Sequence, residues 1–139
     1  FSKSINCSLS RAYNFKSILT NEPADIYANP TYLPDDMQAD YDRYWTDARV
    51  DRVLDVLERY GIALEINARY RIPSFGIIRR AKQRGIKFTF GTNNVDADFG
   101  RLEYSLEAVE KCGLTADDIW FPAMSVRRGR PVVLYNKFE

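Results

Sequence analysis

Three short apolar segments of the chain each run directly into a group of polar side chains. These groups contain ten residues: Asn29 and Thr31; Glu65, Asn67, Arg69 and Arg71; and Thr92, Asn93, Asn94 and Asp96. Amide and guanidinium groups suit hydrogen bonding to phosphate or carboxylate oxygens, so most of these residues are candidates for binding a small anionic ligand. The two carboxylates, Glu65 and Asp96, are the candidate catalytic residues.

The sequence contains few of the residues that most often bind metal ions. The 139 residues include no histidine, and Cys7 and Cys112 match no metal-binding spacing. Histidine is the commonest metal ligand and acid-base side chain in proteins. We therefore expect no metal site from this chain alone, and we expect Cys112 to be a small buried residue within a helix.

The same polar residues also have a purely structural interpretation. Asn and Asp side chains bond to their own backbone in turns, so an amide after a strand can simply close a loop. Arginines such as Arg69 and Arg71 commonly extend over the surface. Both interpretations stay open at the level of sequence.

Composition limits the domain count and the partners. The length fits one domain, and 20 Lys and Arg against 19 Asp and Glu give a net charge of +1. No general field therefore attracts nucleic acid or an anionic membrane, and Arg127, Arg128 and Arg130 are expected to form a solvated tail. No apolar run approaches the roughly 20 residues of a membrane-spanning helix. We expect a soluble protein, cytoplasmic or exported after processing, and the absence of an initiator Met suggests a processed product or part of a longer chain.

The polar groups must be positioned by alternating strands and helices. Apolar spacing predicts strands over residues 25–28, 62–66 and 87–91, and helices over residues 9–19, 47–60, 73–85 and 102–112. Pro73 is expected in the first turn of its helix. The last of these helices is expected to place Leu102, Leu106, Val109 and Cys112 on one side, and Thr115 with Asp118 predicts a capping box beyond it. A further strand or an extended tail is expected over residues 132–135.

This alternation predicts an α/β fold with a parallel sheet of three or four strands. An open doubly wound sheet and part of a (β/α) barrel both fit. In either fold, ligands bind at the carboxyl ends of the strands, where all three polar groups occur.

Four segments, taken in order, resemble the later half of the PHP family, the polymerase and histidinol phosphatase superfamily of metal-dependent phosphoesterases. They are residues 25–30 (DIYANP), 63–67 (ALEIN), 88–93 (FTFGTN) and 100–104 (GRLEY), and the resemblance covers roughly residues 21–114. It implies a distorted seven-stranded (β/α) barrel with a multinuclear metal site at the carboxyl ends of its strands. This chain would be a single domain over residues 1–139 that forms the carboxyl-terminal portion of such a barrel.

The resemblance also marks where metal ligands are replaced. The family's His-Pro at a strand end corresponds to Asn29-Pro30, and its closing Gly-Ser/Thr-Asp-x-His corresponds to residues 91–95, with Asn93 in place of Asp and Val95 in place of His. Its amino-terminal His-x-His motif has no counterpart. Neutral amides are weak ligands for transition metals, so the fragment alone is expected to be inactive in metal-assisted hydrolysis.

Two hypotheses follow from these substitutions. The first is a PHP-like hydrolase homologue with a degenerate metal site, in which Mn, Zn or Mg is bound only through ligands from outside this chain. The second is a non-catalytic PHP-like module that binds an anionic or phosphorylated ligand or mediates assembly. A sheet of so few strands has open edges, which a second copy or a missing amino-terminal half could cover.

Overall fold

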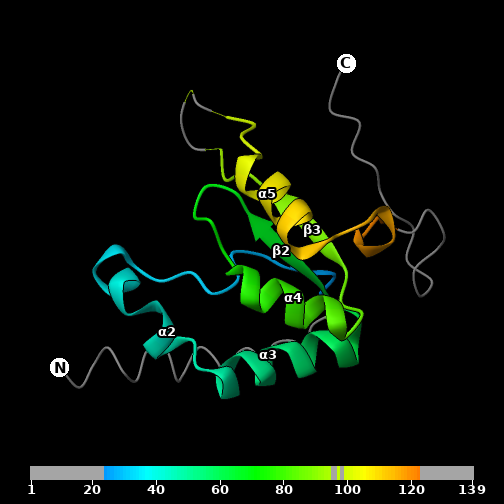
Figure 1. Cartoon of the computed structure of the whole chain (residues 1–139), viewed down its shortest axis with the longest axis horizontal. Helices are drawn as coiled ribbons and strands as arrows, with labels where there is room; N and C mark the ends of the chain where they lie inside the picture. The colour runs from blue at the N-terminus through cyan, green and yellow to red at the C-terminus, as the bar shows by residue number, and fades with distance from the viewer. Residues whose placement is uncertain (1–23, 95–96, 98, 123–139) are drawn as a thin grey trace.

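The computed structural model describes residues 24–94, 97 and 99–122 (Figure 1). The elements, in order, are β1 (Ile26–Tyr27), the 3-10 helix η1 (Asp35–Asp40), α2 (Tyr41–Tyr44), α3 (Asp47–Tyr60), β2 (Ala63–Asn67), α4 (Phe75–Gln83), β3 (Phe88–Gly91), α5 (Glu103–Cys112) and the 3-10 helix η2 (Ala116–Asp118). The predicted helix over residues 9–19, the predicted strand over residues 132–135 and the arginines of residues 127–130 lie outside the described residues. None of the described helices is long and apolar enough to span a membrane.

The three strands form one parallel sheet in the order β1, β2, β3. Leu64 of β2 pairs with Phe88 of β3, and Asn67 at the end of β2 pairs with Gly91. On the outer side of β3, Ile119 forms a parallel bridge with Phe88, and the Trp120 N–H donates to the Phe88 carbonyl oxygen at 2.8 Å. The predicted parallel sheet is confirmed with three strands, and residues 119–120 extend its edge only through this isolated bridge and hydrogen bond.

Helix α3 follows its sequence pattern closely. Val50, Val53, Leu54 and Leu57 are buried on one side of it, as apolar residues spaced three and four apart should be. The helix begins after Thr46 and ends at Gly61, whose φ of 65° lies in the left-handed region that glycine adopts without steric cost. Its bounds are those expected from the sequence.

Two helical predictions are wrong in detail. Helix α4 begins at Phe75 with Ser74 as its N-cap, so Pro73 precedes the helix and does not occupy its first turn. Helix α5 buries Tyr104, Ser105, Ala108 and Cys112, whereas Leu102 and Leu106, predicted to lie on the same side as Cys112, are 38% and 65% exposed. The apolar residues of α5 lie on two adjacent sides of the helix, and contact with α4 and β2 determines which side is covered.

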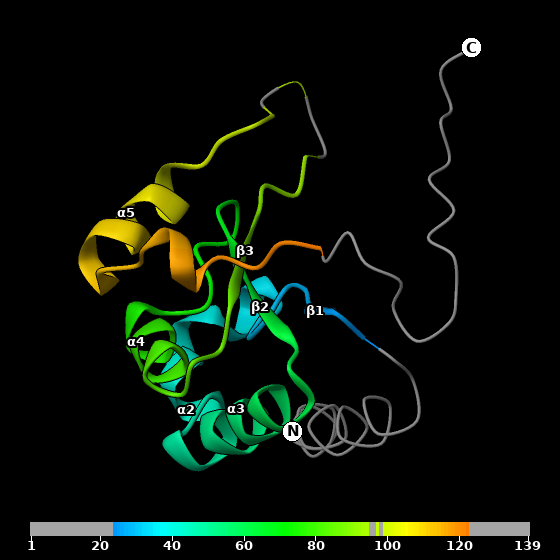
Figure 2. The same cartoon turned by 90° about the vertical axis from the view of Figure 1, so that its right-hand side faces the viewer.

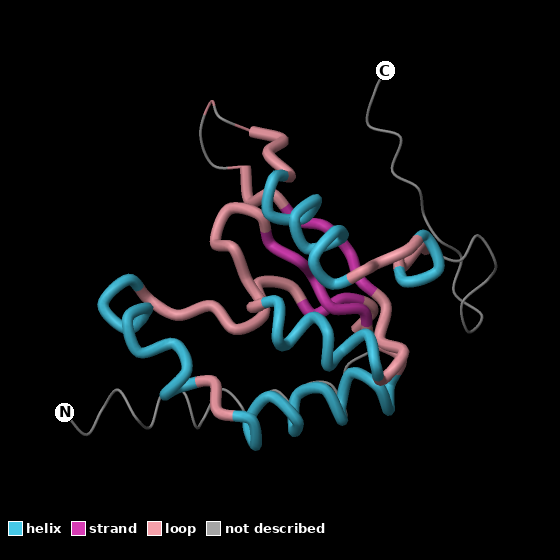
Figure 3. Tube along the Cα trace, viewed as in Figure 1, coloured by secondary structure: helices cyan, strands magenta, loops and turns pink. Residues whose placement is uncertain are grey.

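The described α-helices of the core lie on one face of the sheet (Figure 2, Figure 3). Leu64, Ile66 and Phe88 share one apolar cluster with residues of α3, α4 and α5. Because side chains alternate along a strand, Glu65 and Asn67 of β2 project to the opposite face. Arg80 of α4 and Arg84, the C-cap of α4, form ion pairs with Asp51 of α3 at 2.5 and 2.6 Å, which link the two helices outside the core.

Candidate functional site

The side chain of Asn29 joins the carboxyl ends of all three strands. Its Oδ1 atom accepts hydrogen bonds from Asn67 Nδ2 at 2.9 Å and from Asn93 Nδ2 at 2.8 Å. Asn29 follows β1, Asn67 ends β2 and Asn93 follows β3, so residues up to 64 positions apart meet at one point. The predicted convergence is thus observed for these three amides, which we call, together with Glu65, the rim cluster.

Glu65 contributes the carboxylate of the rim cluster. Its Oε2 atom accepts the Asn29 backbone N–H at 2.5 Å and lies 3.5 Å from Asn67 Nδ2. Its Oε1 atom lies over Gly91, where a Cβ would come within 1.9 Å of it. The half-buried carboxylate therefore occupies space that only glycine leaves open.

Asn67 is the most constrained member of the cluster. Its side chain is fully buried, and its Oδ1 atom accepts the Tyr70 backbone N–H at 3.1 Å. Its own backbone exchanges hydrogen bonds with Ile72, at 2.7 Å for the Asn67 N–H and 3.2 Å for the Ile72 N–H. These bonds fix the loop that follows β2 against the end of the strand.

The loops around the cluster have unusual backbone conformations. Among the described residues, the non-glycine positions with positive φ are Asn29 (48°), Thr31 (63°), Arg71 (51°) and Asn93 (46°). All four lie in loops that leave the carboxyl ends of strands. Such conformations are disfavoured for residues with a Cβ, above all for β-branched threonine, and they concentrate at functional sites.

Two of the predicted site residues are bound away from the cluster. Thr31 is buried, and its Oγ1 atom accepts a hydrogen bond from Tyr41 OH at 2.5 Å. Burial raises the pKa of Tyr41, so the phenol remains a donor. Thr31 therefore anchors the segment of η1 and α2 to the loop after β1.

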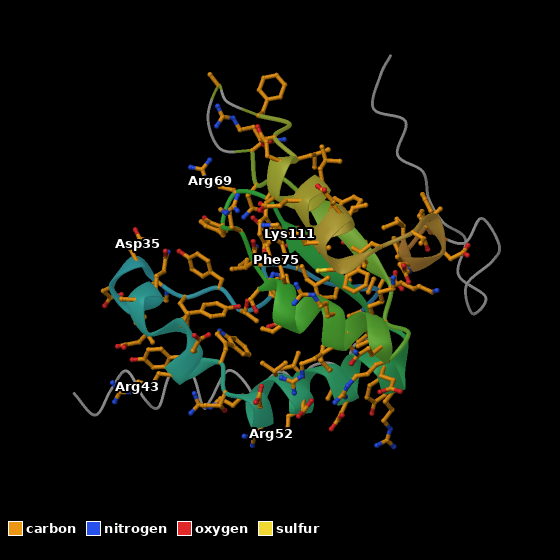
Figure 4. The ribbon with its side chains drawn as sticks, in the orientation of Figure 1. Asp35, Arg43, Arg52, Arg69, Phe75 and Lys111 are labelled. Carbon is orange, nitrogen blue, oxygen red and sulfur yellow. The ribbon has the colours of Figure 1, made fainter. Side chains whose placement is uncertain are left out.

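Arg71 is held by helix α5. Its Nη2 atom lies 2.8 Å from Glu107 Oε2, and its guanidinium lies 4.8 Å from the centroid of the Tyr104 ring. The pKa of Glu107 is lowered most by its hydrogen bond from Lys111 and next by its hydrogen bond from Arg71. Lys111 in turn lies 5.0 Å from the ring centroid of Phe75 (Figure 4). The positive charge of Arg71 is thus partly balanced before any ligand is considered.

Three further predicted residues lie in the loops that follow β2 and β3. Asn94 accepts the Gly100 backbone N–H at 2.9 Å and so closes the loop after β3. Arg69 is exposed at the edge of the loop after β2 (Figure 4), and Thr92 is partly buried beside Asn93. Asp96 and Val95 lie outside the described residues.

Residues that sequence reasoning did not assign to the site contribute much of its geometry. Gly91 leaves space for the Glu65 side chain, and the Tyr70 backbone N–H orients the Asn67 amide. Glu107 forms an ion pair with Arg71 and so holds it against α5. A glycine at the end of an apolar strand is a detectable signal of a close approach. Glu107 carries no such signal, because it lies 36 positions from its partner within an ordinary amphipathic helix.

The oxygen donors of the cluster do not fit the multinuclear metal site that the resemblance implies. Asn29 Oδ1 and Asn67 Oδ1 accept N–H donors, so both are turned toward protein groups. In the described part of the chain, no group of three or more His, Cys, Asp or Glu side chains could hold a metal ion. What this arrangement can do chemically is form hydrogen bonds, with one carboxylate at its centre.

Comparison of the chain with models of protein families, with curated proteins and with solved structures finds no match. The geometry of the rim cluster is therefore the basis on which function is proposed.

Proposed function

We propose that this chain is a PHP-like phosphoesterase homologue in which an amide cluster stands where the family has its metal centre. The chain binds a small anionic or phosphorylated ligand at this end of the sheet, without metal-assisted hydrolysis by its own residues. The observation that carries this proposal is the set of hydrogen bonds that joins Asn29, Asn67 and Asn93 beside Glu65.

The arrangement of the sheet supports the PHP-like part of the proposal. Strands that neighbour each other in sequence also neighbour each other in the sheet, and α3, α4 and α5 pack on one face. A doubly wound sheet carries helices on both faces, whereas a (β/α) barrel keeps helices outside and points alternate side chains inward. In a barrel, Glu65 and Asn67 would face the interior at its carboxyl-terminal end.

The hydrogen bonds of the amides support the non-hydrolytic part. By resemblance, Asn29 and Asn93 stand at metal-ligand positions, and here they bond to each other. A metal bound at Asn29 Oδ1 would have to displace two N–H donors while gaining a neutral ligand, which is weak for transition metals.

A second candidate function is favoured by Glu65. A carboxylate at the centre of the cluster could assist as a base or as a metal ligand if further ligands came from outside the described residues. In that case the chain would take part in metal-dependent phosphoester hydrolysis.

Metal analysis and a phosphatase assay separate the two candidates. The purified protein is exposed to Mn, Zn or Mg, dialysed, analysed for bound metal and assayed with p-nitrophenyl phosphate. We expect substoichiometric metal and no turnover above the buffer rate. Stoichiometric metal together with turnover that a chelator abolishes would overturn the proposal in favour of the second candidate.

A further inference from the structure

A backbone group sets the orientation of the Asn67 amide in the rim cluster. The Tyr70 N–H donates to Asn67 Oδ1, so the amide nitrogen of Asn67 must be the atom that faces Asn29 and Glu65. An amide presents its donor and its acceptor in different directions. The buried end of the cluster therefore has a defined polarity, which propagates to its neighbours.

That polarity determines what the outer members can offer a ligand. Asn29 Oδ1 accepts from Asn67 and Asn93, which leaves the Asn29 Nδ2 donor directed away from both. Asn93 donates through Nδ2, which leaves its Oδ1 atom as an acceptor. Within residues 24–94, 97 and 99–122, neither of these two atoms forms a hydrogen bond.

Glu65 adds a second acceptor. Its Oε2 atom is engaged by the Asn29 N–H, while Oε1 lies over Gly91 and receives no hydrogen bond from the described part of the chain. The cluster thus offers the Nδ2 atom of Asn29 as a donor beside two acceptors, the Oδ1 atom of Asn93 and a carboxylate oxygen of Glu65.

We infer that the rim cluster recognises the neighbouring hydroxyl groups of a sugar or other polyol and does not bind a phosphate group directly. A hydroxyl both donates and accepts, so two adjacent hydroxyls can donate to Glu65 and Asn93 while one accepts from Asn29. This inference rests on the proposed function and specifies which end of a phosphorylated ligand the cluster takes.

The charge at the centre disfavours a bare anion at the same position. A phosphate group offers mainly acceptor oxygens, which would meet two acceptors and the negative charge of Glu65. A site discriminates against a ligand when acceptor faces acceptor or when like charges meet. Arg71 is not a free cation for a phosphate group, because Glu107 partly balances its charge.

Side-chain amide NMR tests this inference directly. Protein labelled with nitrogen-15 is titrated with ribose, with inorganic phosphate and with ribose 5-phosphate, and the NH2 signals of Asn29, Asn67 and Asn93 are followed. We expect ribose and ribose 5-phosphate to shift the Asn29 and Asn93 signals with similar affinity, and phosphate alone to leave them unchanged. Shifts with phosphate alone, or no shift with any of the three probes, would overturn the inference.

A matched pair of variants assigns the effect to the central carboxylate. Glu65→Gln preserves size and can still accept the Asn29 N–H, but it removes the charge, so we expect ribose affinity to fall at least about tenfold. Glu110→Gln makes the same change at an exposed position of α5 and should leave affinity unchanged. Equal affinity in both variants, with unchanged melting temperature, would overturn the role of Glu65. The proposed function fails on a different result, metal-dependent turnover, so the two failures can be told apart.

Discussion

Because Gly91 has no side chain, the only carboxylate of the rim cluster, that of Glu65, can lie against it. A Cβ on Gly91 would lie 1.9 Å from Glu65 Oε1 and 2.6 Å from its carboxyl carbon, which no real contact allows. Gly91 pairs with Asn67 as an ordinary strand residue, so glycine is required here for space and not for backbone freedom. Its absent side chain and the Asn29 N–H together determine where the carboxylate lies.

The Gly91→Ala substitution should therefore disturb the hydrogen bonds of the rim cluster more than the overall fold. The added methyl group must push Glu65 away, and the Asn29 N–H loses its acceptor, so we expect a loss of about 1 to 3 kcal/mol in the free energy of unfolding. The measurements are chemical denaturation and the NMR signal of the Asn29 amide.

The control for this change is Gly76→Ala in helix α4. A Cβ there meets nothing closer than Ser74 Oγ at 3.8 Å, and alanine favours helix over glycine by about 0.5 to 1 kcal/mol. The control should be neutral or stabilising. A Gly91→Ala protein as stable as wild type, with an unchanged Asn29 signal, would contradict the packing described.

At the scale of elements, the sequence predicts well where local signals agree. Helix α3 has a clear apolar side, a capping position and a terminal glycine, and its bounds are confirmed. In α5 the apolar residues are spread over two adjacent sides, so periodicity could not select the side that carries Tyr104. Arg71 illustrates the same limit at the site, because the residue that holds it is distant in sequence.

The short helix η2 makes stability depend on pH. Asp118 Oδ2 accepts the Thr115 backbone N–H at 2.8 Å, which confirms the predicted capping box. This hydrogen bond is the main cause that lowers the pKa of Asp118 below its usual value. A carboxyl group with a lowered pKa stabilises the fold above its unfolded-state pKa, and this contribution is lost as pH falls through the folded-state pKa.

The Asp118→Asn substitution should thus lower the free energy of unfolding more at neutral pH than at acidic pH. We expect a loss of about 0.5 to 1 kcal/mol near pH 6 that shrinks as the pH falls below 3.8, the usual pKa of Asp, through the lower folded-state pKa. Thermal unfolding across this range measures it, with Asp117→Asn at the neighbouring exposed position as the control. A difference that stays constant with pH would show that the charge of Asp118 does not contribute.

At the scale of the whole molecule, one core on one face of the sheet supports the site on the other. The strand-end rule correctly brought Asn29, Asn67 and Asn93 together, because parallel strands align their carboxyl ends. It could not predict the exact partners, since hydrogen bonds between loops depend on backbone angles that the sequence does not reveal. The left-handed conformations at Thr31 and Arg71 are examples.

A pair of leucine substitutions tests where this core ends. Leu57 is fully buried, so Leu57→Ala should cost about 2 to 5 kcal/mol, whereas Leu106→Ala, at a side chain that is 65% exposed, should cost within about 0.5 kcal/mol. Denaturant unfolding at two protein concentrations measures both. A large, concentration-dependent cost for Leu106→Ala would mean that another copy of the chain covers this side of α5.

The left-handed backbone around the rim has a consequence for the thermodynamics of association. Asn29 and Asn93 already have left-handed backbone conformations, and hydrogen bonds join Asn29 to Asn93 and to β2. A ligand would therefore not have to order these loops, and the conformational entropy of ordering them is lost during folding instead. Association at this rim should carry a small entropic penalty, so even a ligand that makes only a few hydrogen bonds could be retained.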